Sequence, residues 1–245
     1  MGRTMHAITY DPIHDEFSVP QQFGQAVLTF RGGANGEEPP LRVIQGSLTQ
    51  LQNPDRLDVD PVHNEIFVPQ DDVVLVFPRE AVGNVAPIRV LKGTQMPVGR
   101  VAVAVDPVHD LLVVGGSQSG VGGRLLIYNR TDQGSTKPRA VIGGPRSGLG
   151  TVQGPFGVYP PRNEIILGSR IGRRGEISEM ASENFYVGVW STQDNGDIPP
   201  RFLIGGPHGV LRQVRGVALD PTHKSIIVSD KRLNAVMTFY VPEIF

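Results

Sequence analysis

The segment Leu57–Gly93, LDVDPVHNEIFVPQDDVVLVFPREAVGNVAPIRVLKG, holds four short apolar runs separated by turn residues. Its β-branched and aromatic residues crowd runs that are bounded by Pro, Gly, Asn and Asp, which is typical of β-strands. One four-stranded sheet cannot bury both of its faces, whereas several copies stacked radially can. The segment therefore predicts one unit of a larger all-β repeat.

The same pattern recurs along the whole chain. Asp-Pro-x-His begins at Asp11, Asp60, Asp106 and Asp220, and a degenerate copy begins at Tyr159. Five residues after each of these positions a second strand begins. Repeats of close to 50 residues with four strands each match the blades of a β-propeller. We therefore predict an all-β, single-domain propeller over residues 1–245, with blades at about 1–50, 51–96, 97–147, 148–209 and 210–245.

An aromatic residue closes the third strand of every copy. In four copies it also opens the spacing aromatic-x5-Gly-x3-Pro-x5-Gly. We expect these five aromatics to occupy equivalent buried places between blades: Phe30, Phe77, Tyr128, Trp190 and Phe239. The histidines of the Asp-Pro-x-His turns recur once per blade, so we interpret them as turn residues that bond their own Asp or backbone rather than as metal ligands.

The last copy carries the clearest resemblance to a known family. The segment from Arg215 to Phe239, RGVALDPTHKSIIVSDKRLNAVMTF, resembles an NHL repeat, with its Gly-x-Ala-x-Asp strand followed by a strand pair. The resemblance implies a β-propeller, often six-bladed in that family. It also implies a role as an extracellular enzyme, a protein- or RNA-binding platform or a scaffold, and an extracytoplasmic (periplasmic or secreted) location.

Composition narrows the classes of function. The formal net charge is -1, which argues against bulk electrostatic binding of nucleic acid or anionic membranes. The chain has no Cys, so disulfides, thiolate zinc sites and cysteine nucleophiles are excluded. No apolar run approaches the roughly 18 residues of a membrane span.

Loop lengths single out one face of the predicted propeller. With the strands of a blade lettered A to D from the axis outward, the A–B and C–D connections have fixed spacing, whereas the B–C connections vary. Variable loops on a rigid scaffold are where binding surfaces are usually built, so the B–C and D–A face is the candidate working face. It includes an insertion in the fourth blade, Ser169–Asn184, which is interpreted either as a docking loop or as a tolerated surface excursion.

Basic residues on that face are the candidate ligand-binding residues for a polar or anionic small ligand or a partner protein. Arginines recur just ahead of the first strand of a blade, and further basic residues lie in the loops; the full set is Arg3, Arg56, Arg100, Arg215, Arg173, Lys231 and Arg232. Alternatively, each of the recurring arginines pairs with a neighbouring carboxylate or backbone carbonyl.

The leading functional hypothesis is a non-catalytic propeller that binds a ligand or a protein through the B–C and D–A face. The alternative is a propeller lyase or hydrolase, resembling metal-dependent lactonases or amidating lyases, with a site at the mouth of the central channel. No catalytic or metal-binding residue is assigned and no cofactor is predicted. Ca²⁺ or Zn²⁺ in the channel stays open under the alternative.

The strand count leaves the last blade incomplete. Five copies of the first three strands are present but only four of the outer strand, because the last copy stops six residues after Phe239. We expect the chain to extend upstream of Met1 with the missing strand, so that the parent ring has five or six blades. If Met1 is the start, the edge around Val236–Val241 is expected to add a strand from another chain.

Overall fold

The computed structural model describes residues 6–93, 95–97, 101–118, 122–152, 154–170, 185–206 and 208–245. Over those residues the strands form five antiparallel sheets, four with four strands and the last with three. Three short 3₁₀ helices, η1 (Ser47–Thr49), η2 (Pro145–Ser147) and η3 (Pro160–Arg162), lie in the connections. None of the helices in these ranges is long and apolar enough to span a bilayer.

Each sheet is one blade, and its strands follow one another in chain order. Blade 1 contains β1 (Thr9–Asp11), β2 (Glu16–Gln21), β3 (Ala26–Arg31) and β4 (Arg42–Gln45). Blade 2 contains β5 (Asp58–Asp60), β6 (Glu65–Gln70), β7 (Val73–Pro78) and β8 (Arg89–Leu91). Blade 3 contains β9 (Val101–Asp106), β10 (Leu111–Gln118), β11 (Gly122–Asn129) and β12 (Ala140–Gly143). Blade 4 contains β13 (Gly157–Tyr159), β14 (Glu164–Arg170), β15 (Phe185–Ser191) and β16 (Phe202–Gly205), and blade 5 contains β17 (Val214–Asp220), β18 (Ser225–Asp230) and β19 (Ala235–Tyr240).

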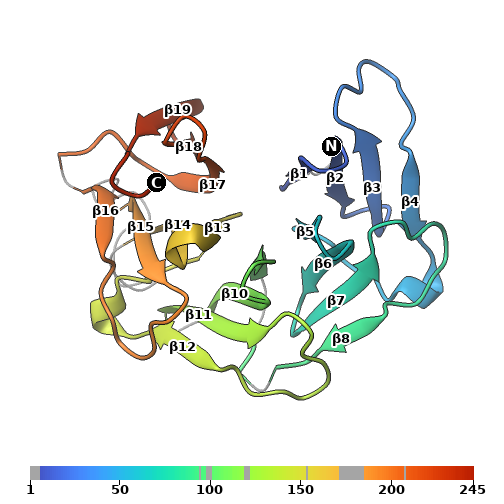
Figure 1. Ribbon diagram of the computed structural model, residues 1–245, viewed down its shortest axis with the longest axis horizontal. Coiled ribbons are helices and arrows are strands. Elements are labelled where there is room, and N and C mark those ends of the chain that lie inside the picture. Colours follow the sequence, from blue (N-terminus) through green and yellow to red (C-terminus); the bar gives the residue numbers. More distant parts are fainter. Residues whose placement is uncertain are drawn as a thin grey trace.

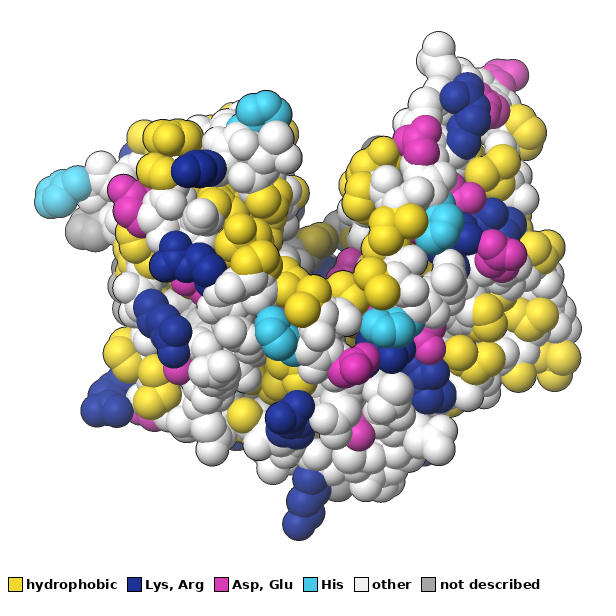
Figure 2. Space-filling view, in the orientation of Figure 1, with side chains coloured by type: hydrophobic (Ala, Val, Ile, Leu, Met, Phe, Trp, Pro, Cys, Tyr) yellow, Lys and Arg dark blue, Asp and Glu magenta, His cyan; other side chains and the backbone are white. Residues whose placement is uncertain are grey.

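The five blades lie around a common axis, with the first strand of each blade innermost and β4, β8, β12 and β16 at the periphery (Figure 1). Blades 1 and 5 face each other across an opening in the ring, which is a deep notch in the space-filling view (Figure 2). The predicted all-β propeller with five blades and a three-stranded last blade is therefore confirmed.

The A–B turn explains why Asp and His recur at fixed spacing. In blade 2, Asp60 is fully buried, and its Oδ1 accepts hydrogen bonds from the N–H groups of Val62 and His63 at 3.0 Å. Its Oδ2 lies 2.7 Å from Nδ1 of His63. The same Asp–His contact of 2.7–2.8 Å recurs in blades 1, 3 and 5. The interpretation of these histidines as turn residues is confirmed, and the residue that follows each turn, such as Asn64, has a left-handed backbone with φ of 57°.

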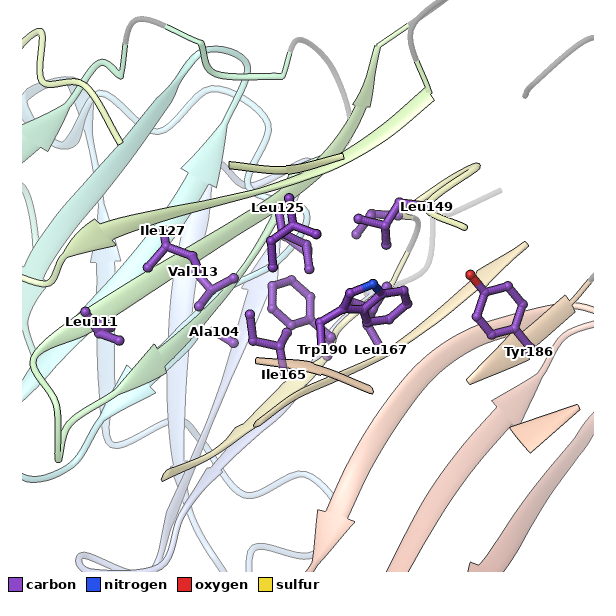
Figure 3. Close-up of a cluster of buried hydrophobic side chains, with 14 residues drawn as sticks. Ala104, Leu111, Val113, Leu125, Ile127, Leu149, Ile165, Leu167, Tyr186 and Trp190 are labelled. Atoms are coloured by element: carbon purple, nitrogen blue, oxygen red, sulfur yellow. The ribbon is translucent and has the colours of Figure 1, made fainter. Parts of the chain in front are cut away.

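Consecutive blades are held together by apolar side chains from facing sheets. The cluster between blades 3 and 4 joins Ala104, Val113 and Leu125 to Trp190 and Tyr186 (Figure 3). The closing aromatic of each later blade points toward the preceding blade. Burying such a ring removes most of its apolar surface from water, which stabilises the packing of consecutive blades.

The predicted burial of the five aromatics differs between inner and terminal blades. Phe77, Tyr128 and Trp190 are each 0% exposed, as expected. Phe30 and Phe239 are only partly buried. Phe30 stacks on Phe17 with 5.3 Å between ring centroids, on the face that a preceding blade covers in the other copies. Phe30 has no blade ahead of it in the structure, and Phe239 lies in β19, whose outer edge no strand of the described residues covers, so the repeat position alone does not bury the ring.

A backbone contact between blades explains the fixed C–D spacing. The N–H of Gly83 donates to the carbonyl of Val43 at 2.7 Å, and the N–H of Gln45 donates to the carbonyl of Gly83 at 3.1 Å. Gly134 and Gly196 make the same bridge to β8 and β12. The turn glycine, whose φ is 76° at Gly83, thus ties each blade to the outer strand of the blade before it.

Candidate functional site

The B–C and D–A face carries two adjoining hollows where blades 1 and 2 meet. One has a volume of about 590 Å³ and lies between the β2–β3 turn and the connection from β4 to β5. The other, about 270 Å³, lies between that connection and the β6–β7 turn. Gln50 and Gln52 line both, so the two form one surface, which we call the glutamine groove. Its glutamines are Gln25, Gln45, Gln50, Gln52 and Gln70.

Some glutamine side chains of the groove hydrogen-bond to its backbone, whereas others are exposed at its surface. Gln70 is 8% exposed; its Oε1 accepts from the N–H of Gln52 at 3.0 Å, and its Nε2 donates to the carbonyl of Gln50 at 2.5 Å. Nε2 of Gln45 donates to the carbonyl of Gly24 at 2.7 Å. These two amides hold the loops in place. The side chains of Gln50 and Gln52 are exposed at the surface.

The charge of the groove is mixed and small. Asp71 and Asp72 form one wall of the smaller hollow and Lys92 lies on another. Most of the remaining polar groups are amides and backbone, which both donate and accept hydrogen bonds. Such a lining suits an uncharged polar group or the main chain of a peptide better than a multiply charged ligand.

The basic residues predicted from the sequence do not form one exposed rim. Arg56 is only 5% exposed; it lies 3.2 Å from Asp55 and donates to the carbonyl of Val101 at 3.4 Å. Its side chain is thus used within the fold, as the alternative interpretation had it. Arg215 is partly buried, whereas Lys231 and Arg232 are exposed in the β18–β19 turn. The binding role of the set stays a prediction, and Arg3, Arg100, Arg173 and residues 171–184 of the insertion lie outside the described residues.

Asp58 is the most perturbed acid on the inner strands. Oδ2 of Asp58 in β5 accepts a hydrogen bond from the N–H of Val105 in β9 at 2.8 Å, which joins the inner strands of blades 2 and 3. Burial of this carboxyl raises its pKa to about 7, although hydrogen bonds from the N–H groups of Val105 and Val59 act in the other direction. An acid with a pKa near neutrality can exchange protons at physiological pH.

The raised pKa of Asp58 can be tested by comparing the pH dependence of the melting temperature of the wild type and of Asp58→Asn. The folded-state pKa lies above the ordinary value of 3.8, so ionisation of Asp58 weakens folding as the pH rises from about 4 to 7. Asn keeps an oxygen for the N–H of Val105 and never ionises. We expect the variant to have the higher melting temperature at pH 8, with the difference shrinking toward zero near pH 4. A difference that does not change with pH would contradict the assignment.

In the ranges that the structure describes, no group of three or more His, Asp or Glu side chains is placed so that it could hold a metal ion. The Asp–His pairs of the A–B turns are separate from one another, one to a blade. Ca²⁺ or Zn²⁺ in the channel stays a prediction of the enzyme alternative.

The described architecture defines a β-propeller. No protein-family model matches the chain, and no curated protein sequence matches it. Among solved structures, hydrazine synthase of Kuenenia stuttgartiensis is similar, with a TM-score of 0.67 and 12% sequence identity. The match covers 97% of this chain and 64% of that chain, so this chain spans less than two thirds of its neighbour. Likeness at this identity shows the propeller fold alone, and the resemblance to NHL repeats rests on the sequence motif.

The groove lies on the B–C and D–A face, whose role as the working face stays a prediction, and the residues of the groove were not predicted. The glutamines come from the β2–β3 turn, the ends of β4 and β6 and the β4–β5 connection, and they follow no motif. One signal was present: four of the five groove glutamines fall within residues 21–52.

Proposed function

We propose that this propeller is a non-catalytic scaffold that binds a polar ligand or a segment of a partner protein through its B–C and D–A face. The observation that supports the proposal is the glutamine groove, whose two hollows join across blades 1 and 2 on that face. The exposed amides of Gln50 and Gln52 offer both donors and acceptors, which an extended peptide backbone or another polyamide or polyhydroxyl ligand can use. The exposed Lys231 and Arg232 lie on the same face and add attraction for an anionic group.

A paired substitution tests the groove. Gln52→Ala removes one exposed amide, and Gln50→Asn shortens the other with a residue that tolerates the left-handed backbone at φ of 60°. We expect a binder selected from a library of short polar peptides by the wild-type protein to lose about fivefold or more in affinity, since two hydrogen bonds are worth about 1–3 kcal/mol. Gln133→Ala in the opposite C–D face is the control and should bind as the wild type does. Equal binding by all three proteins would contradict the proposal.

Assembly by strand addition is a second part of the proposal. β19 pairs with β18 on one side, and within the described residues no strand pairs with its other side. In the other blades the equivalent edge is covered by β4, β8, β12 or β16. We expect a synthetic peptide with the sequence of residues 87–93, PIRVLKG, to bind the protein and to protect the amides of β19 from hydrogen exchange. Unchanged exchange at saturating peptide would contradict strand addition.

The enzyme alternative has one observation in its favour, the carboxyl of Asp58 with a pKa of about 7 between inner strands. A lyase or hydrolase with a site at the channel mouth would need such an acid or base. Elemental analysis of the purified protein separates the two functions most simply. Stoichiometric Ca²⁺ or Zn²⁺ that is lost in Asp58→Asn would favour the enzyme over the scaffold.

A further inference from the structure

On the A–B and C–D face, blades 1, 2 and 3 are joined by a repeated ionic cluster. Between blades 2 and 3, Glu65 accepts two hydrogen bonds from Arg89 of its own blade, at 2.8 and 2.6 Å. It accepts a third at 2.6 Å from Arg130 of the next blade. Between blades 1 and 2 the same places hold Glu16, with Arg42 and Arg79 as its partners. A carboxylate clamped by two guanidinium groups thus fills each of these junctions.

The junction between blades 3 and 4 lacks all three charged side chains. Leu111 pairs with Asp106 in the way that Glu65 pairs with Asp60. Ala140 lies opposite Ile127, in the place of Arg89 opposite Val76. Thr192 replaces Arg130: its N–H donates to the carbonyl of Asn163 at 2.8 Å, as the N–H of Arg130 does to Asp110.

Shorter side chains at these places leave a pocket. It has a volume of about 510 Å³, within the range of about 300–1,000 Å³ that is usual for small-molecule sites. Leu111, Ile127 and Ala140 form its apolar part, and Leu111 and Ile127 belong to the core cluster between the two blades (Figure 3). The pocket is therefore seated on rigid, packed strands rather than on a loop.

Polar groups at the pocket have unmet hydrogen-bonding capacity. Thr192 is 6% exposed, and its buried Oγ1 has no hydrogen-bond partner. Arg139 donates to the neutral Oδ1 of Asn129 at 3.2 Å, and among the described residues no carboxylate forms an ion pair with it. The ring of His109, at the rim, is held through Nδ1 by Asp106 at 2.8 Å. No Asp or Glu lines the pocket.

We propose that this pocket binds a small organic carboxylate with a short apolar body. In the two preceding junctions the protein supplies its own carboxylate to a pair of arginines. Here it supplies a cation, Arg139, and an apolar floor, and the carboxylate is the missing component. The ligand carboxylate pairs with the guanidinium of Arg139, Thr192 Oγ1 donates to a ligand oxygen, and the apolar body covers Leu111 and Ala140.

Matched carboxylates and amides test the charge requirement. Butyrate and benzoate are titrated into the 15N-labelled protein at pH 7, and butyramide and benzamide serve as neutral analogues of the same shape. We expect saturable chemical-shift changes confined to residues around Ala140 and Thr192 for the acids, with the amides at least about tenfold weaker, since a charge-assisted hydrogen bond contributes about 1.5–3 kcal/mol. Absence of saturable shifts, or equal binding of acid and amide, would overturn the proposal.

Variants locate the site. Arg139 is exposed, so Arg139→Gln leaves the fold intact and should weaken benzoate binding by about tenfold or more. Arg201→Gln, at the equivalent place in blade 4, is the matched control and should bind benzoate as the wild type does. Ala140→Leu fills the apolar part and should abolish binding, with circular dichroism to show that the variant is folded. Unaltered binding by Arg139→Gln, or an equal loss in Arg201→Gln, would overturn the site. The glutamine-groove variant should leave benzoate binding unchanged, so this proposal and the scaffold proposal fail independently.

Discussion

Trp190→Ala is expected to lower the free energy of unfolding by about 3–5 kcal/mol, the usual cost of removing a large buried aromatic ring. Trp190 is 0% exposed and packs in the core cluster between blades 3 and 4. Its Nε1 has no hydrogen-bond partner, so the loss arises from packing and cavity formation alone. Gly188 faces the ring closely, because a Cβ at that position would lie within 2.7 Å of Trp190 Cζ3. A contact this tight leaves the neighbouring backbone little freedom to collapse into the cavity.

Phe30→Ala is the matched comparison, because Phe30 has the same place in the repeat but is only partly buried at the opening of the ring. Full burial of a Phe side chain is worth about 1.5–3 kcal/mol, so a partly buried ring should cost about half of that. Urea unfolding followed by far-ultraviolet circular dichroism measures both variants. Equal losses for Trp190→Ala and Phe30→Ala would show that the blade 3–4 interface contributes no more than the open face of blade 1.

The fold was predictable because each of its repeated positions has a local cause. Asp60 closes its turn with its own carboxylate, and Gly83 has a left-handed backbone, so the spacing of such residues marks the strands without knowledge of the tertiary structure. The difference between Trp190 and Phe30 was not predictable in this way. The burial of each aromatic side chain depends on whether a neighbouring blade covers it, and this depends on how the five blades are arranged around the axis.

The candidate sites were harder to predict because each is shared between blades. The change from Glu65 to Leu111 is visible when the repeats are aligned. The pocket that results from this change also depends on Thr192, which comes from the following blade and lies 81 positions further along the chain than Leu111. Arg56 shows the converse: its recurrence ahead of a first strand was visible, but its burial against Asp55 was not.

The ionic cluster between blades 2 and 3 gives the second large effect. Glu65→Leu is expected to cost about 3–5 kcal/mol, because it leaves the buried Arg89 without a carboxylate partner and takes one carboxylate from Arg130, which keeps its ion pair with Asp110 at 2.8 Å. The side chains of Glu65, Arg89 and Arg130 are 10%, 16% and 9% exposed, so water compensates little. At the junction between blades 4 and 5, Oε2 of Glu164 is buried without a hydrogen-bond partner. Glu164→Leu is therefore the control and should be close to neutral.

The blade 3–4 junction indicates which further substitutions should restore the stability that Glu65→Leu loses. Glu65→Leu combined with Arg89→Ala and Arg130→Thr places the neutral residue types of the blade 3–4 junction at the blade 2–3 junction. This triple variant should be more stable than Glu65→Leu alone, although it removes more contacts, because no guanidinium group is left buried without its carboxylate. Burial raises the pKa of Glu65, but Arg89 and Arg130 outweigh it and hold the pKa below the ordinary 4.5. The contribution of Glu65 is thus complete above that pH and is lost as the pH falls through its lowered pKa. The gap between wild type and Glu65→Leu should close in acid, and a triple variant no more stable than the single variant at pH 7 would contradict this account of the cluster.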